Sequence, residues 1–136
     1  MKMLRLLIPL FAVIAAGCAG TGSGSSNSGG GSAATVVLMT GSHSFNPTNV
    51  TVAAGSTVQW QNSDTARHTV ASDTGVPNLN SDPAYAAGLP GGAAFNWTVP
   101  AGATSGTVFY YHCEFHGSAG DGSHLGTGMA GSITVQ

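Results

Sequence analysis

The segment that decides the fold spans residues 106–116 and reads GTVFYYHCEFH. Its β-branched and aromatic residues predict a strand over Gly106–Cys113. Side chains alternate between the two faces of a strand, so Phe109, Tyr111 and Cys113 are expected to share the inner face. The cysteine is therefore expected to point into the domain at the end of a buried strand.

Further segments of the same kind flank this strand and are separated by clusters of Gly, Pro, Asn and Asp. Short strands with turn residues between them predict an all-β sandwich or barrel. The least strand-like part is Asn78–Pro90, where a turn of helix is expected. The other expected strands are Thr35–Thr40, Asn49–Ala53, Thr57–Asn62, His68–Ser72, Ala94–Val99 and Ala130–Val135.

Residues that commonly bind metals gather around the end of the 106–113 strand. Cys113 and His116 are three residues apart and can reach one metal ion from a loop that leaves the strand. Met129 follows in a GMAG run, and His68 is the natural second histidine. One thiolate, two imidazoles and a weak axial thioether form the donor set that suits copper in an electron-transfer site. His112 points away from Cys113 on the opposite strand face and is expected not to be a ligand.

Three other interpretations use the same residue types. Two Cys in an extracytoplasmic protein usually form a disulfide, but Cys18 is expected to carry lipid, which leaves Cys113 alone. A structural zinc site normally offers paired Cys or paired His, and Met is not a usual zinc ligand. A catalytic Cys–His pair fits the residue types, but it leaves Met129 and the second His unexplained.

Several motifs follow one another in a recognisable order: FNP at 45–47, VAAGSTV at 52–58, WQN at 60–62, HTV at 68–70, YHCEFH at 111–116, GMAG at 128–131 and ITV at 133–135. Together they resemble the cupredoxins, the small blue-copper proteins, and within them the plastocyanin-like branch. The resemblance covers nearly all of Thr35–Gln136. It implies a Greek-key β-sandwich of about seven to eight strands with one copper ion near one end. The family's equatorial ligands match His68, Cys113 and His116, and its axial ligand matches Met129.

The sequence departs from the plastocyanin pattern at two places. Twelve residues separate His116 from Met129, where plastocyanin-like proteins usually have only a few. This Gly-rich insertion contains Asp121 and His124, and His124 is a rival to Met129 as the axial ligand. The simpler interpretation of His124 is a solvated loop residue. The second departure is His112, which stands where plastocyanins commonly place an exposed Tyr.

Other residues near the expected copper site have weaker assignments. Phe115 is expected to pack around the Cys113 sulfur. Asn62 is expected to be a polar neighbour on the metal-facing side of its strand, because it shares a face with Val58 and Trp60. His43 is expected in a loop at the copper end, as an ordinary surface residue rather than a contact for a redox partner. The two tryptophans, Trp60 and Trp97, are expected in the core.

The N-terminal region is expected to lie outside the folded domain. Residues 1–17 have a positive start, a short apolar run and small residues at the end, which predicts a signal peptide. The run AAGC at 15–18 resembles a bacterial lipobox and predicts lipidation of Cys18. Residues 18–34 form a Gly- and Ser-rich tether, which leaves 35–136 as the copper domain. The expected location is extracytoplasmic and lipid-anchored, and the outer membrane is favoured where the cell has one.

Charged residues are scarce, with three Lys or Arg against five Asp or Glu. Removal of the signal peptide leaves Arg67 as the one basic residue. Such a surface cannot neutralise a phosphate backbone, so nucleic-acid binding is not expected. Long-range steering of a protein partner is expected to be weak.

These features predict a monomeric one-electron carrier at a membrane surface, which exchanges electrons with a redox protein, rather than an enzyme. Two alternatives stay open. One is a copper-binding or copper-handling protein without electron traffic. The other is a small redox enzyme in which the long loop leaves a copper position open.

Overall fold

The computed structural model describes residues 33–136. This range forms eight strands and no helix, which confirms the expected all-β class. The expected signal peptide, Cys18 and nearly all of the expected tether lie outside the described residues. Within the described range, no helix is long and apolar enough to cross a bilayer. The strands are β1 (Thr35–Thr40), β2 (Ser44–Asn46), β3 (Asn49–Val52), β4 (Thr57–Asn62), β5 (Ala71–Ser72), β6 (Ala94–Thr98), β7 (Val108–Ser118) and β8 (Thr127–Val135).

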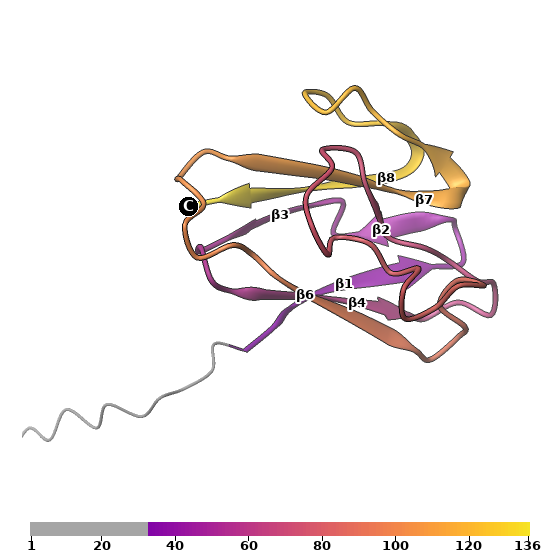
Figure 1. The fold of residues 1–136 in the computed structure, drawn as a ribbon. Helices are drawn as coiled ribbons and strands as arrows, with labels where there is room; N and C mark the ends of the chain where they lie inside the picture. Colours follow the sequence, from indigo (N-terminus) through magenta and orange to yellow (C-terminus); the bar gives the residue numbers. More distant parts are fainter. Residues whose placement is uncertain (1–32) are drawn as a thin grey trace, which may run out of the picture. The chain divides into compact units, whose positions relative to one another are not determined.

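The strands form two four-stranded sheets that pack as two layers (Figure 1). One sheet has the order β2-β1-β4-β6 and the other has the order β3-β8-β7-β5. The pairs β1 with β4 and β3 with β8 are parallel, and the other neighbours are antiparallel. Because successive strands repeatedly change sheets, the connections are those of a Greek-key sandwich rather than a meander.

Two parts of the N-terminal half differ from the expected strands. The strand β2 is not predicted from the sequence, since three residues are too few to show a periodicity. It forms because a tight turn after Thr40 returns the chain onto β1. The expected strand His68–Ser72 is wrong in its first half: only β5 pairs with β7, and His68 forms an isolated bridge to Leu89 instead.

The segment Asn78–Pro90 packs against the stretch that carries His68. The expected turn of helix is present as one hydrogen-bonded turn, in which the Tyr85 N–H donates to the Ser81 carbonyl at 2.9 Å. The Ser81 hydroxyl accepts from the Val70 N–H at 3.0 Å, and the Leu89 N–H donates to the His68 carbonyl at 2.7 Å. The backbone around His68 is therefore held without belonging to a regular strand.

The strands β7 and β8 are longer than expected because the Gly-rich insertion continues their pairing. His112 faces Ala130, and after an irregularity in the register Gly117 faces Gly128. The chain between the two strands forms a hairpin that extends beyond the sheet (Figure 1). The two ends of the insertion therefore extend the β7–β8 hairpin, and residues 119–126 form its loop.

The core is built around Tyr111 on β7. The rings of Phe45 and Trp60 meet the Tyr111 ring edge to face, at centroid distances of 4.9 and 5.1 Å. The Tyr111 hydroxyl lies against Gly131, where a Cβ would stand only 2.5 Å from its oxygen. Trp60 and Trp97 are buried as expected. This packing fixes the position of β7 two residues before Cys113.

Candidate metal centre

Three donor atoms meet at one end of the sandwich. The Nδ1 atoms of His68 and His116 are 3.1 Å apart, and they lie 3.8 and 3.5 Å from the Cys113 sulfur. A point equidistant from the three atoms lies about 2.0 Å from each, which is the length of a metal–nitrogen bond to an imidazole. The triangle is thus the right size to hold one metal ion at its centre.

Cys113 reaches this triangle because of its place on β7. The strand alternates as expected, with Phe109, Tyr111 and Cys113 buried and with Tyr110 and His112 partly exposed. The Cys113 side chain is fully buried, and within residues 33–136 it forms no disulfide. Because side chains alternate along the strand, the Cys113 sulfur points inward at the end of the core.

The sulfur accepts a hydrogen bond from the backbone. The Thr69 N–H donates to the Cys113 sulfur at 3.3 Å, and the Thr69 hydroxyl oxygen accepts from the Glu114 N–H at 2.8 Å. These two hydrogen bonds hold the His68–Thr69 segment against the end of β7. The hydrogen bond from Thr69 also fixes the position of the sulfur beside the two histidines.

His68 is oriented by a carboxylate. Its Nε2 lies 3.1 Å from Oδ2 of Asp64, so that Nε2–H donates to the carboxylate and Nδ1 is left unprotonated toward the sulfur. The His68 hydrogen bond is the largest of the interactions that lower the pKa of Asp64 below its ordinary value. A negatively charged Asp64 thus selects the tautomer of His68 that is able to bind a metal.

Asn62 supports the loop that carries this pair. Its side-chain NH2 donates to the carbonyls of Ala66 and Leu89 at 2.8 and 2.9 Å, and its side-chain oxygen accepts from the Asp64 N–H at 2.8 Å. The side chain is almost completely buried. Asn62 acts on the backbone behind His68, and the sequence, which placed it only by strand alternation, does not reveal these partners.

The irregularity between β7 and β8 places Met129 opposite the donor-bearing segment. Between the paired positions His112–Ala130 and Gly117–Gly128, the four residues 113–116 of β7 face only Met129 of β8. The Met129 side chain is fully buried. Gly117 packs so closely on this strand that a Cβ there would stand 2.5 Å from the Met129 carbonyl oxygen. The close pairing of Gly117 and Gly128 thus brings Met129 back beside His116 across the long insertion.

This geometry agrees with the comparison of the chain with known families. A family model described as copper binding proteins, plastocyanin/azurin family, matches residues 33–136. The chain belongs to this family. Copper is accordingly its cofactor, one ion per chain, and the donor triangle fits such an ion.

Solved cupredoxin structures share the fold. A mutant of amicyanin in its reduced Cu(I) form at pH 4 is 21% identical, with a TM-score of 0.54 over 76% of this chain and 83% of that one. A purple cupredoxin from Nitrosopumilus maritimus is 21% identical, with a TM-score of 0.52 over 75% and 99%. A copper-containing nitrite reductase from Thermus scotoductus is 22% identical, with a TM-score of 0.55, and the 76% of this chain that aligns covers 22% of that enzyme.

In this cupredoxin, His43 contacts the donor triangle. Its ring stacks on the His116 ring at a centroid distance of 4.0 Å and an interplanar angle of 9°. Burial lowers the pKa of His116 below its ordinary value, and repulsion from His43 and then His68 lowers it further. His43 is an exposed loop residue, as expected, but the sequence does not show that it stacks on His116.

Phe115 does not pack around the Cys113 sulfur as expected. Its side chain is 54% exposed, and a Cβ at Gly88 would stand 2.6 Å from its ring. The irregular pairing after His112 turns Phe115 outward, over the Gly88 backbone. The polar contact from Thr69, rather than an aromatic ring, is what the described residues supply to the sulfur.

The other two histidines lie apart from the three donor atoms. His112 bonds through Nδ1 to the Asp73 carboxylate, whose second oxygen accepts from the Gly120 N–H at 2.8 Å. Asp73, which the sequence did not single out, has a fully buried side chain and ties the hairpin to β7. The His124 side chain is 80% exposed and pairs with Asp121 on the hairpin.

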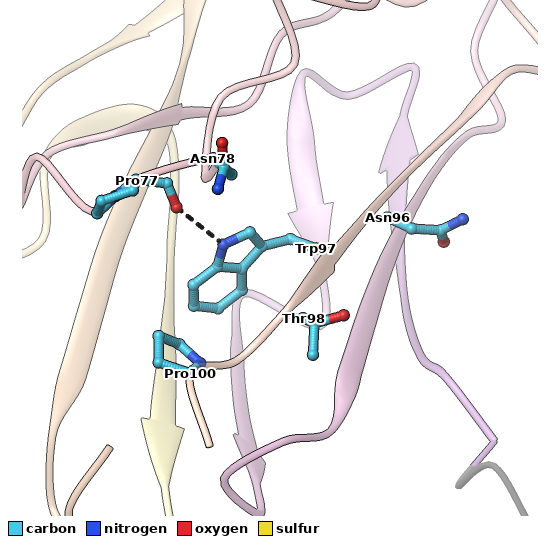
Figure 2. A pocket seen from close by; sticks show the side chains of 6 residues that line it. All are labelled: Pro77, Asn78, Asn96, Trp97, Thr98 and Pro100. Carbon is cyan, nitrogen blue, oxygen red and sulfur yellow. Dashed lines mark hydrogen bonds between the residues drawn. The ribbon is translucent and has the colours of Figure 1, made fainter. Parts of the chain in front are cut away.

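A pocket elsewhere on the domain shares no residue with the donor triangle. It has a volume of about 410 Å³, and it is lined by Pro77, Asn78, Asn96, Trp97, Thr98 and Pro100 (Figure 2). The Trp97 indole N–H donates to the Pro77 carbonyl at 3.4 Å. The polar groups of this pocket are exposed amides and hydroxyls, and none of them is among the metal donors.

Proposed function

We propose that this protein is a blue-copper electron carrier, with copper held equatorially by His68, Cys113 and His116 and axially by Met129. The observation that carries the proposal is the donor triangle, whose sides suit a single trigonal copper site. Soft sulfur favours Cu(I) and imidazole accommodates both oxidation states. When bound, copper supplies the reversible one-electron couple between Cu(II) and Cu(I).

The surrounding residues suit electron transfer because they hold the donors in one geometry. Thr69 fixes the Cys113 sulfur, Asp64 fixes the ring of His68, and Asn62 fixes the loop between them. Donors held in this way cannot relax toward the geometry that either oxidation state would prefer alone. His116 is the partly exposed donor, so its edge is the natural contact for a redox partner.

Met129 is the better candidate for the axial ligand. It is fully buried and faces residues 113–116 across the irregular pairing. His124 is largely exposed and already bonded to Asp121. A weak thioether from Met129, rather than a third imidazole, would therefore complete the proposed donor set.

We further propose that the domain is held by lipid on Cys18 at an extracytoplasmic membrane surface. The support comes from the signal-like residues 1–17, the AAGC run and the Gly- and Ser-rich residues that follow it. Cys18→Ser in the full chain tests this: the variant should move from the membrane fraction to the soluble fraction. Equal membrane association of the two proteins would contradict lipid anchoring.

The copper-loaded protein provides the test of the redox function. The Cu(II) form should show an intense thiolate-to-copper visible band, and ascorbate should bleach it reversibly by one electron per chain. Met129→Leu should shift this band and raise the reduction potential, whereas His124→Ala should leave both unchanged. A colourless Cu(II) protein would contradict a blue-copper centre. A blue form that exchanges no electrons with small redox proteins would indicate copper handling instead.

A further inference from the structure

The turn between β1 and β2 is rigid and lies against both histidine donors. The His43 N–H donates to the Thr40 carbonyl at 2.9 Å, and His43 itself adopts a left-handed conformation with φ of 54°. The hydroxyls of Thr40, Ser42 and Ser44 bond to one another at 2.8–2.9 Å. These contacts hold the backbone of the turn in one conformation.

A different residue of the turn lies near each of the two histidine donors. Gly41 lies beside Asp64, the partner of His68, since a Cβ at Gly41 would stand 3.4 Å from the carboxylate. His43 lies flat on His116, and its ring meets His68 edge-on at a centroid distance of 6.1 Å. An exposed imidazole held in this way covers one face of the one partly exposed donor.

We propose that His43 is a positioning residue that fixes the orientation of the His116 ring through the stacked contact. His116 needs such support more than the other histidine. Within the described residues, His68 is held by a hydrogen bond to Asp64 and by two backbone hydrogen bonds to Leu89. The side chain of His116 instead contacts the other donors and neighbouring rings. A ring that keeps one orientation in both oxidation states lowers the reorganisation needed for electron transfer. This inference rests on the proposed function.

The consequence appears when one copy of the protein passes an electron to another. In this self-exchange, the Cu(I) copy gives one electron to the Cu(II) copy, and no other molecule takes part. Without the stacked ring, His116 samples more than one orientation in the Cu(I) form and must reorient before transfer. The exchange rate should therefore fall, while the copper remains bound.

Two variants and one control test the proposal. His43→Ala removes the ring, His43→Phe keeps a flat ring that can stack, and His124→Ala removes another exposed histidine away from the donors. In the Cu(I) form, nuclear magnetic resonance should show one set of His116 ring signals in the wild type, in His43→Phe and in His124→Ala. His43→Ala should show broadened or doubled signals and self-exchange slower by about tenfold, equivalent to about 1.4 kcal/mol in the barrier.

The outcomes separate this inference from the proposed function. A visible blue band in all four proteins establishes the copper centre independently of His43. With that band present, wild-type signals and exchange in His43→Ala would overturn the positioning role. Loss of the single His116 orientation in His43→Phe as well would also overturn it, because stacking would then not be the operative contact.

Discussion

The two sides of the copper site are supported in different ways. On the buried side, His68 and Cys113 are completely enclosed and are held by backbone and carboxylate hydrogen bonds. On the outer side, His116 is held by a stacked ring, and Met129 by the glycine-mediated closure of a hairpin. The buried side is thus held by hydrogen bonds, whereas the outer side, where Met129 is itself fully buried, depends on the stacked His43 ring and on the pairing of Gly117 with Gly128. Substitutions on the two sides should accordingly change different properties.

The largest effect is expected from removing the sulfur on the buried side. Cys113→Ser replaces a soft thiolate with a hydroxyl, which is a poor ligand for copper and cannot give a thiolate charge-transfer band. We expect complete loss of the intense visible absorption, measured on the Cu(II)-loaded protein. Cys18→Ser is the matched control and should keep the band. An intense band in Cys113→Ser would show that the sulfur is not a donor.

The next largest effect is expected from Asn62→Ala, which tests whether the buried side belongs to the core. It removes three hydrogen bonds and leaves the buried Leu89 carbonyl with one fewer donor. We expect the free energy of unfolding of the metal-free protein to fall by about 3 kcal/mol in a denaturant titration.

Asn96→Ala provides the comparison, because Asn96 is exposed and its side-chain oxygen accepts one hydrogen bond, from Gln59, within the described part of the chain. Its effect should be below about 1 kcal/mol. Equal losses for the two variants would mean that the loop behind His68 is not held by Asn62.

On the outer side, Gly117→Ala should disturb Met129 without unfolding the domain. The new methyl group would collide with the Met129 carbonyl, so that the hairpin must shift, at a cost of about 1–3 kcal/mol. We expect altered visible band ratios and electron-spin parameters in the Cu(II) form. Gly102→Ala is the control, since a Cβ there meets nothing within 4 Å. Unchanged spectra in Gly117→Ala would show that the position of Met129 does not affect the copper centre.

The smallest effect is expected from Asp64→Asn, which keeps the shape of the His68 partner but removes its charge. A negative charge near the copper stabilises Cu(II) more than Cu(I), so its removal should raise the reduction potential. A tenfold shift in the equilibrium corresponds to about 59 mV for one electron, and we expect a change of about this size by voltammetry.

Asp82→Asn removes the same charge from a residue that, among residues 33–136, bonds to Asn80 and Tyr85 and to none of the three donors, and it should change the potential much less. An unchanged or lowered potential in Asp64→Asn would contradict the role of Asp64. The pKa of Asp64 is below its ordinary value, so Asp64 is charged at neutral pH. Its effect on the reduction potential should therefore be present at pH 7 and be lost only as the pH falls through that pKa.

The tertiary structure also shows how the chain is arranged around the insertion that set the axial ligand in doubt. In sequence, twelve residues separate His116 from Met129. In space, Gly117 pairs with Gly128, so that the insertion begins and ends at one point and projects away as a hairpin. His116 and Met129 are therefore each next in sequence to a member of this glycine pair. No periodicity in the sequence reveals this pairing, because it depends on close backbone approach at two glycines.

The sequence by itself determined the all-β class, the inward face of β7 and the set of residues that converge as donors. It did so because strand alternation and metal-ligand chemistry are local properties that residue type and spacing express directly. The tertiary structure alone decided that Asp64 orients His68, that Asp73 ties the hairpin to β7 and that His43 stacks on His116. The Asp73 and His43 contacts join segments that are brought together only by the packing of the sheets and turns. Asp64 and His68 are only four residues apart, but the irregular loop that turns them toward one another has no local pattern that would predict the contact.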